Sequence, residues 1–308
     1  MYYKSIQELI GNTPIVQLSR VLSRMSKPVN PGVNLFAKLE LYNPSGSVKD
    51  RIGQSMLLDA EQSGALVAGG TIIEATAGNT GLGIAFAALG RGYRVIFVVP
   101  EKFSQEKQTL MRALGAEVIN TPKEGGMQGA SKKAEELRDE IPNAVAFRQF
   151  KNPVNPETHY KTTGAEIYAA MEGKIDYIVC GAGSGGTFSG IMKYMKERDP
   201  NIKGILADPL GSVIGGGEHG EYDIEGIGND FIAETMDTSL VDSVIKITDR
   251  EAFEHTRLLA REEGIIAGSS SGAALAASLR FAATIEKGNI VTVFPDRGDR
   301  YFSKNLLG

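Results

Sequence analysis

One lysine lies among small, turn-forming residues in the stretch Asn43-Pro-Ser-Gly-Ser-Val-Lys-Asp-Arg51. The preceding residues 35–41 read as a strand, and the apolar residues of 52–60 recur at helical spacing. Ser47 is a candidate N-cap of that helix, so Lys49 stands near the positive end of its dipole and beside an arginine. Both features disfavour the charged form of the lysine amine. Because a neutral amine attacks carbonyl carbon, Lys49 is a candidate for covalent catalysis. The alternative is a surface lysine that follows a loop.

Two glycine-rich loops occur where a predicted strand meets a predicted helix. They are Thr76-Ala-Gly-Asn-Thr-Gly81, after the apolar run 71–74, and Gly181-Ala-Gly-Ser-Gly-Gly-Thr187, after the run 177–180. Glycines let successive backbone N–H groups converge on an anion, and the helix N-terminus adds favourable partial charge. Each loop is therefore a candidate anion site. The second loop matches the dinucleotide motif only weakly, since that motif belongs on the first strand–turn–helix unit of a chain.

Together, the lysine stretch and the two loops resemble those of the cysteine synthase and cystathionine β-synthase family of pyridoxal-phosphate (PLP) enzymes. This family is the β-replacement branch of fold type II. The likeness covers nearly all 308 residues, through Leu9–Pro14, Pro100–Ser104, Gln149–Pro153, Gly268–Ala273 and Phe294–Asp296. Within the family, the chain is similar to the bacterial cystathionine β-synthase-like and hydrogen sulfide-producing members.

The resemblance implies a set of residues that hold the cofactor. Lys49 corresponds to the lysine that forms a Schiff base with PLP, and Asn79 to the residue that bonds the phenolic oxygen of the ring. Ser270 corresponds to the serine that faces the pyridine nitrogen, with the alternative that it is only a helix N-cap. The phosphate cup is matched by Gly183, Ser184, Gly185, Gly186 and Thr187.

The resemblance also implies a site for the substrate carboxylate. Its matching residues are Thr76, Ala77, Asn79, Thr80 and, from another segment, Gln149. Many cysteine synthases carry serine where this chain has Ala77, so one hydroxyl contact is missing and backbone N–H groups must contribute more. His159 and Tyr160 match a further stretch of the family, and we expect a structural role for both.

Asp230 is the residue at which the chain departs from the cysteine synthase pattern. It lies in Gly226-Ile-Gly-Asn-Asp-Phe231, which aligns with an active-site loop. Cysteine synthases usually have small or apolar residues there, and bacterial cystathionine synthases often have an acid. A carboxylate repels hydrosulfide and suits a second substrate with an ammonium group, or a thiol that needs a base. We therefore expect Asp230 to be catalytic together with Lys49. The alternative is an exposed loop aspartate.

A repeating pattern of strands and helices must position these residues. Short apolar runs alternate with helix-like segments, which predicts an α/β fold with mainly parallel sheets and helices on both faces. The predicted strands are 34–41, 71–74, 94–99, 117–120, 177–180, 204–207 and 290–294. The resemblance adds the tryptophan synthase β-like architecture of two three-layer α/β/α domains. These are a large PLP-binding domain of residues 1–38 and 151–308, and a small mobile domain of residues 39–150.

The composition argues against several other classes of protein. A content of 42% hydrophobic and 23% charged residues is typical of a globular protein. The net charge of −4 argues against nucleic-acid binding, and no run of about eighteen apolar residues exists to span a membrane. Cys180 is the only cysteine, and we expect it to be a buried apolar residue. The N-terminus lacks the apolar core of a signal peptide, so we expect a cytoplasmic location. No metal site is predicted.

We therefore expect β-elimination and β-replacement on cysteine, serine or O-acetylserine, with cysteine or homocysteine as the nucleophile. The product would be lanthionine or cystathionine, and hydrogen sulfide would be released when cysteine is the first substrate. One alternative is cysteine synthase, which joins sulfide to O-acetylserine. Another is a catalytically silent sensor of PLP or amino acids, against which the intact Lys49 argues. By likeness, we expect a homodimer and a catalytic core without the regulatory and haem segments of animal cystathionine synthases.

Overall fold

The computed structural model describes residues 2–25, 29–76, 78–101, 103–304 and 306–308. The chain folds into two compact units. A smaller unit contains Met1–Ile10 and Asn43–Asn155, and a larger unit contains Gly11–Tyr42 and Pro156–Gly308. Residues 1–10 therefore group with the smaller unit, whereas the family resemblance places them in the large domain. The mobility of the small domain stays a prediction.

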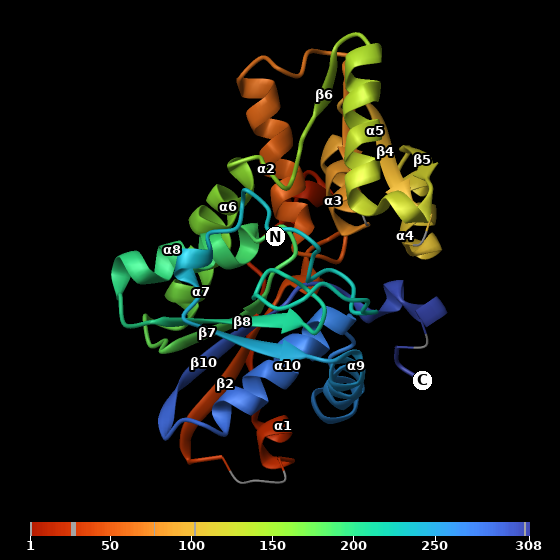
Figure 1. The fold of residues 1–308 in the computed structure, drawn as a ribbon. Coiled ribbons are helices and arrows are strands. Elements are labelled where there is room, and N and C mark those ends of the chain that lie inside the picture. Colours follow the sequence, from red (N-terminus) through yellow and green to blue (C-terminus); the bar gives the residue numbers. More distant parts are fainter. Residues whose placement is uncertain (1, 26–28, 77, 102, 305) are drawn as a thin grey trace. The chain divides into compact units, whose positions relative to one another are not determined.

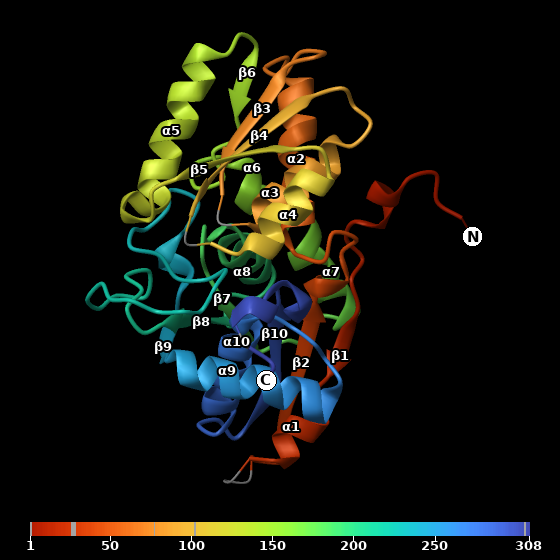
Figure 2. The same ribbon diagram turned by 90° about the vertical axis from the view of Figure 1, so that its right-hand side faces the viewer.

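The smaller unit contains a parallel sheet with the strand order β5-β4-β3-β6. Its strands are β3 (Thr71–Ala75), β4 (Arg94–Pro100), β5 (Glu117–Thr121) and β6 (Ala144–Ala146). One face of the sheet packs on α5 (Gly126–Glu140). The other face packs on α2 (Lys49–Gln62), α3 (Asn79–Ala88) and α4 (Gln105–Ala113), as Figure 2 shows.

Helices α2 and α3 touch along their backbones. A Cβ added at Gly53 would lie 2.4 Å from the carbonyl carbon of Gly83, and a Cβ added at Gly83 would lie 2.3 Å from the carbonyl oxygen of Lys49. Such distances leave no room for a side chain at either glycine. The two glycines therefore hold the first turn of α2, with Lys49, directly against α3.

The larger unit contains a six-stranded sheet with the order β1-β2-β10-β7-β8-β9. The strands are β1 (Ile15–Gln17), β2 (Gly32–Leu39), β7 (Tyr177–Gly181), β8 (Lys203–Pro209), β9 (Ser243–Ile247) and β10 (Lys287–Phe294). All neighbours are parallel except β1 and β2. One face packs on α1 (Ser19–Ser23), α9 (Asp249–Leu258) and α10 (Ser269–Ala282), and the other packs on α7 (Ala165–Ala170) and α8 (Gly186–Arg198) (Figure 1). In α6 (Val154–His159), the chain passes from one unit to the other.

The predicted α/β class with mainly parallel, helix-covered sheets is confirmed, and all seven predicted strands occur. The strand predicted over 34–41 ends at Leu39, because Glu40–Tyr42 form a 3-10 turn. In that turn, the Glu40 carboxylate accepts a hydrogen bond from the Thr13 hydroxyl at 2.6 Å. Strands β1, β6 and β9 are not anticipated from the sequence.

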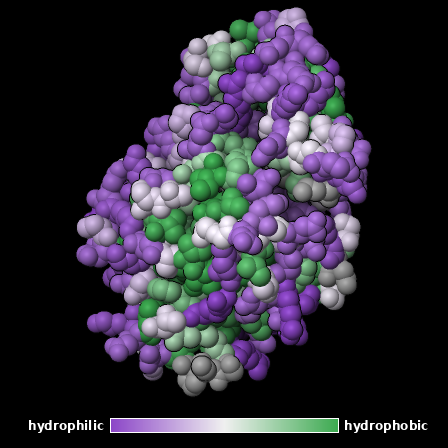
Figure 3. All heavy atoms as spheres, viewed as in Figure 1, coloured by the Kyte–Doolittle hydropathy of each residue, from purple (hydrophilic) through white to green (hydrophobic). Residues whose placement is uncertain are grey.

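On one face of the molecule, the hydropathy of the exposed side chains differs between the two units. On the face seen in Figure 3, most side chains of the smaller unit are hydrophilic, and apolar side chains gather on the larger unit around β2 and β10. Cys180 is buried between the larger sheet and α8, as expected. Among the described residues, no helix has both the length and the apolar character needed to cross a membrane.

Candidate active site

Lys49 is the first residue of α2 and is half-buried. The predicted cap is wrong by one residue: the N-cap is Val48, whose φ of −54° and ψ of −21° already lie in the helical region. Ser47 is buried instead, and its hydroxyl accepts a hydrogen bond from the Lys49 N–H at 3.3 Å. The serine therefore still satisfies a backbone donor at the mouth of the helix, which is the role that the sequence pattern indicates.

The turn before Lys49 is fastened to the same helix. The carboxylate of Asp50 is buried, accepts a hydrogen bond from the Ser45 N–H at 2.6 Å and contacts the Ser45 hydroxyl. Gly46 has a φ of +89°, a conformation that glycine adopts without strain. This anchoring fixes the backbone that carries Lys49.

The first glycine-rich loop is organised by Thr76. Its hydroxyl accepts hydrogen bonds from the N–H groups of Gly78, at 3.0 Å, and Gly81, at 3.2 Å. Gly78 is the N-cap of α3 with a φ of +143°, and a Cβ there would lie 2.3 Å from Cδ of Lys107. Asn79 is the first residue of α3 and is half-buried. Ala77 lies outside the described residues.

Gln149 comes from a distant segment and joins this loop. The Thr80 hydroxyl donates to Oε1 of Gln149 at 2.6 Å, and Nε2 of Gln149 donates to the Ala75 carbonyl at 3.2 Å. The structure thus brings together Thr76, Thr80 and Gln149, as the resemblance implies for the carboxylate site. Their role in binding substrate stays a prediction.

Glu74 binds the backbone at Gln149 and is not among the site residues predicted from the sequence. Its carboxylate accepts the backbone N–H groups of Arg148 at 2.7 Å and Gln149 at 3.0 Å. Burial raises the pKa of Glu74 from 4.5 to about 7, although the two backbone hydrogen bonds oppose the rise. The only sequence signal is an acid inside the otherwise apolar run Thr71–Ala75.

In the larger unit, the second glycine-rich loop joins β7 to α8. The helix begins at Gly186, two residues before the predicted start at Phe188, and its N-cap Gly185 has a φ of +82°. A Cβ at Gly183 would lie 2.8 Å from the Gly226 carbonyl oxygen, and a Cβ at Gly185 would lie 2.4 Å from Cβ of Met236. Both positions therefore require glycine.

This loop has the donor set that a phosphate needs. The first-turn N–H groups of α8 have no partner within the helix, and Ser184 and Thr187 add hydroxyl groups. The helix dipole favours an anion at this end, and the loop of 181–187 contains no lysine or arginine. The residues present thus fit the phosphate of PLP.

His159 reaches the same loop, and the structural role expected for it stays a prediction. Its ring is fully buried between two hydroxyls, with Nε2 at 3.1 Å from Oγ1 of Thr187 and Nδ1 at 2.9 Å from Oγ1 of Thr163. Thr163 lies in the π-helical turn Tyr160–Gly164, a type of distortion that is frequent at functional sites. A Cβ at Gly190 would lie 2.7 Å from Cβ of His159, so α8 packs tightly against the histidine.

Ser270 lies in the first turn of α10 and is buried. The helix N-cap is Gly268, so Ser270 is not the N-cap. The neighbouring Ser269 hydroxyl accepts a hydrogen bond from the Glu225 N–H at 3.0 Å. A Cβ at Gly226 would lie 3.7 Å from Oγ of Ser270, which places this serine beside the loop that carries Asp230.

The Asp230 loop is fastened to the phosphate loop within the larger unit. The N–H of Gly228 donates to the carbonyl of Ala182 at 2.7 Å, and the Thr235 hydroxyl donates to the carbonyl of Ser184 at 2.5 Å. Asp230 itself is exposed. Burial and the carboxylates of Asp208, Asp230 and Asp249 raise the pKa of Tyr222, so its phenol stays neutral.

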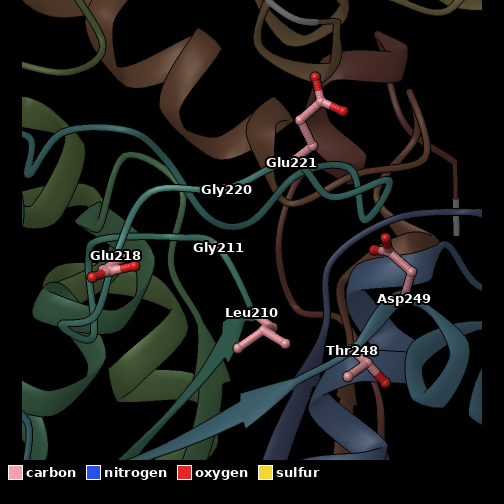
Figure 4. A pocket seen from close by; sticks show the side chains of 7 residues that line it. All are labelled: Leu210, Gly211, Glu218, Gly220, Glu221, Thr248 and Asp249. Atoms are coloured by element: carbon pink, nitrogen blue, oxygen red, sulfur yellow. The ribbon is translucent and has the colours of Figure 1, made fainter.

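A separate hollow of about 480 Å³ lies near the start of α9 (Figure 4). Its lining includes the carboxylates of Glu218, Glu221 and Asp249 and the exposed side chain of Leu210. Oδ1 of Asp249 accepts hydrogen bonds from the backbone N–H groups of Asp223 and Ile224, which belong to the same unit. The hollow contains none of the predicted site residues. The described residues also show no cluster of three or more His, Cys, Asp or Glu that could hold a metal ion.

Comparison with known proteins agrees with this geometry. A family model described as "Pyridoxal-phosphate dependent enzyme" matches residues 6–296. The chain is 50% identical to an O-acetylserine dependent cystathionine β-synthase of Bacillus subtilis, over 98% of this chain and 96% of that protein. It is 45% identical to a cysteine synthase of Helicobacter pylori, over 99% of both chains.

A solved structure shows the same likeness. The crystal structure of a hydrogen sulfide-producing enzyme from Fusobacterium nucleatum matches with a TM-score of 0.92 and 38% identity, over 97% of this chain and 100% of that chain. The fold type II architecture expected from the sequence is thereby confirmed. The chain belongs to the family of pyridoxal-phosphate dependent enzymes, in its cysteine synthase and cystathionine β-synthase branch, and catalyses PLP-dependent β-replacement.

Proposed function

We propose that this enzyme replaces the β-substituent of cysteine, serine or O-acetylserine with the thiol of a second amino acid, cysteine or homocysteine. The product is cystathionine or lanthionine, and hydrogen sulfide is released when cysteine is the first substrate. The observation that carries the proposal is the exposed carboxylate of Asp230 on a loop fastened to the phosphate loop. The names of the relatives from Bacillus subtilis and Fusobacterium nucleatum support it.

When bound, PLP supplies a carbonyl for a Schiff base and an electron-withdrawing ring. Lys49 would provide the amine that holds PLP, and its Nζ, once the substrate amine has displaced it, would take the proton from Cα of the substrate. Asn79 bonds the ring oxygen. Gly183, Ser184, Gly185, Gly186 and Thr187 bind the phosphate through backbone N–H and hydroxyl groups.

Ser270 sets the chemistry in this proposal. A hydroxyl opposite the pyridine nitrogen leaves that nitrogen without a proton, whereas a carboxylate would hold a proton there. With Ser270 at this position, the ring would withdraw electrons less strongly, and loss of the β-substituent would be favoured. The burial of Ser270, and its position beside Gly226 rather than at the N-cap, support this role.

The substrate carboxylate is proposed to bind at the loop of the smaller unit. Thr76, Asn79, Thr80 and Gln149 supply hydroxyl, amide and backbone donors, together with the backbone at Ala77. The hydrogen bonds of Thr76 to Gly78 and Gly81 hold this loop in shape. Because alanine replaces the serine of many cysteine synthases, the backbone carries more of the binding.

Asp230 selects the second substrate in this proposal. Its negative charge repels hydrosulfide, attracts the ammonium group of an amino acid and can accept a thiol proton. We expect Asp230→Asn to slow addition of homocysteine by at least about tenfold, or about 1.4 kcal/mol of transition-state stabilisation. Loss of the β-substituent should change much less, because Lys49 performs that step.

Stopped-flow absorbance separates the two half-reactions, and steady-state rates with sulfide, cysteine and homocysteine compare the nucleophiles. Asp223→Asn is the matched control, since it removes an equal charge from an exposed position of the preceding segment. Equal slowing of both half-reactions, or unchanged addition of both amino-acid thiols, would contradict the proposed role of Asp230.

Plain cysteine synthase is the second candidate, favoured by the 45% identity to the Helicobacter pylori enzyme. Higher turnover with sulfide than with either amino-acid thiol would establish it. The silent sensor gains no support, because the relatives are enzymes. The homodimer and the cytoplasmic location stay predictions.

A further inference from the structure

Glu74 is a buried carboxylate for which the proposed reaction has no use. It lies in β3, where every residue is buried, and its side chain is 2% exposed. Oε2 accepts the Arg148 N–H at 2.7 Å and Oε1 accepts the Gln149 N–H at 3.0 Å. Two consecutive backbone donors thus converge on one carboxylate, an arrangement stronger than neutral hydrogen bonds.

The backbone that Glu74 holds is in an unfavourable conformation. Arg148 has a φ of +55°, which costs a residue with a side chain about 1 kcal/mol. The guanidinium of Arg148 is held by a bidentate ion pair with Glu135 on α5, at 2.6 and 2.7 Å. The next residue, Gln149, then directs its amide to the Thr80 hydroxyl and the Ala75 carbonyl. The orientation of the Gln149 side chain therefore depends on how its backbone is fixed.

We propose that Glu74 is a positioning residue that fixes the Arg148–Gln149 backbone and thereby orients Gln149 in the substrate-carboxylate site. This inference rests on the proposed function, which places the carboxylate of the first amino-acid substrate at Thr76, Thr80 and Gln149. Glu74 acts through Gln149 and contacts no reacting atom.

The charge of Glu74 offers a direct way to observe this connection. Burial raises the pKa of Glu74 to about 7. The charged groups that face it are Arg148, which lowers the pKa, and Glu135 of α5, which raises it. Protonation converts one carboxylate oxygen into a hydroxyl, so one of the two N–H bonds weakens. The amides of Arg148 and Gln149, which follow β6, should therefore report the ionisation of a side chain that lies on β3.

The first measurement is an NMR pH titration of the holoenzyme with isotope-labelled arginine and glutamine. The backbone amides of Arg148 and Gln149, and the side-chain amide of Gln149, should shift together with a midpoint at about pH 7. Glu74→Gln should abolish this titration. Amide shifts of Arg148 and Gln149 that are the same in Glu74→Gln as in the wild type at every pH would overturn the inference.

The second measurement compares KM and kcat for O-acetylserine with homocysteine as the thiol. A contact to the substrate carboxylate is the same in the bound substrate and in the transition state, so its loss raises KM and leaves kcat unchanged. We expect Glu74→Gln to raise KM about tenfold with kcat within about twofold. Glu135→Gln is the matched control, because it releases the Arg148 side chain and leaves both backbone bonds to Glu74 in place.

The outcomes separate this inference from the proposed function. The positioning role would be overturned if the wild-type amides titrate but KM is unchanged in Glu74→Gln. It would also be overturned if KM rises equally in Glu135→Gln. In both cases, turnover by the wild type would still uphold the proposed function. A wild type that turns over neither O-acetylserine, serine nor cysteine would overturn the function, and the amide titration would still show whether Glu74 controls Gln149.

Discussion

Replacing Glu74 by glutamine should change how the stability of the protein depends on pH. The pKa of Glu74 rises from 4.5 to about 7, so the folded protein keeps a proton that the unfolded chain has already lost. A group with a raised pKa contributes stability that is fully present below the unfolded pKa, here about 4.5. That contribution is lost as the pH rises through about 7.

The size of the effect follows from the same values. A rise of the pKa from 4.5 to about 7 corresponds to about 3 kcal/mol, of which about 2.5 kcal/mol is lost between about pH 5 and pH 8. Solvent screens the charge of Glu74 very little, because this residue is 2% exposed. Glutamine does not titrate, so the variant lacks this component entirely.

Urea unfolding at about pH 5 and about pH 8 measures the difference. From the higher to the lower pH, the free energy of unfolding of the wild type should rise by about 2.5 kcal/mol relative to Glu74→Gln. Glu117→Gln is the control: Arg94 lowers the pKa of Glu117, so its contribution changes only below about pH 4.5. Parallel pH dependence of the wild type and Glu74→Gln would refute the reasoning.

Three further outcomes are expected from the site. Lys49→Ala should leave no PLP-labelled peptide after borohydride reduction and digestion, and a labelled peptide from another lysine would contradict the assignment. His159→Phe removes the hydrogen bond to Thr187, worth about 1 kcal/mol, and should weaken PLP retention about fivefold in equilibrium dialysis, with Tyr160→Phe as the control. Ser270→Asp should slow β-replacement by protonating the pyridine nitrogen, and unaltered turnover would show that Ser270 does not set the chemistry.

The features that sequence predicts well here are local. Lys49 lies at a strand–turn–helix junction whose turn residues are contiguous, and the two glycine loops follow apolar runs directly. Such signals survive because the residues that create them are close in the chain. The seven predicted strands are found for the same reason, because each contains a short apolar run.

The features that sequence misses depend on distant packing. One example is the contact of His159 with Thr187, because nothing near the histidine in the sequence indicates that α8 will place Thr187 at 3.1 Å. Glu74 has no neighbour in sequence that reveals its contact with Gln149, because β6 and the segment after it must first pair beside β3. Strand β6 has only three residues, too few for a periodic pattern. The N-cap of α2 is Val48 and not the predicted Ser47. Val48 adopts helical angles that no residue preference at that position indicates.

In the Asp230 loop, the contacts that fix the backbone, here called the frame, are separate from the side chain that is proposed to select the nucleophile. The frame is made by backbone groups: the Gly228 N–H bonds to Ala182, and the Asn229 N–H bonds to Oγ of Ser212 at 3.1 Å. Gly226 has a φ of +91°, which favours glycine, and its carbonyl oxygen can lie beside residue 183 only because Gly183 lacks a side chain. The side chain of residue 230 is exposed, so its identity can change without repacking any of these contacts. Asp230→Asn should therefore leave folding intact, and any change in the choice of nucleophile can be attributed to the charge itself.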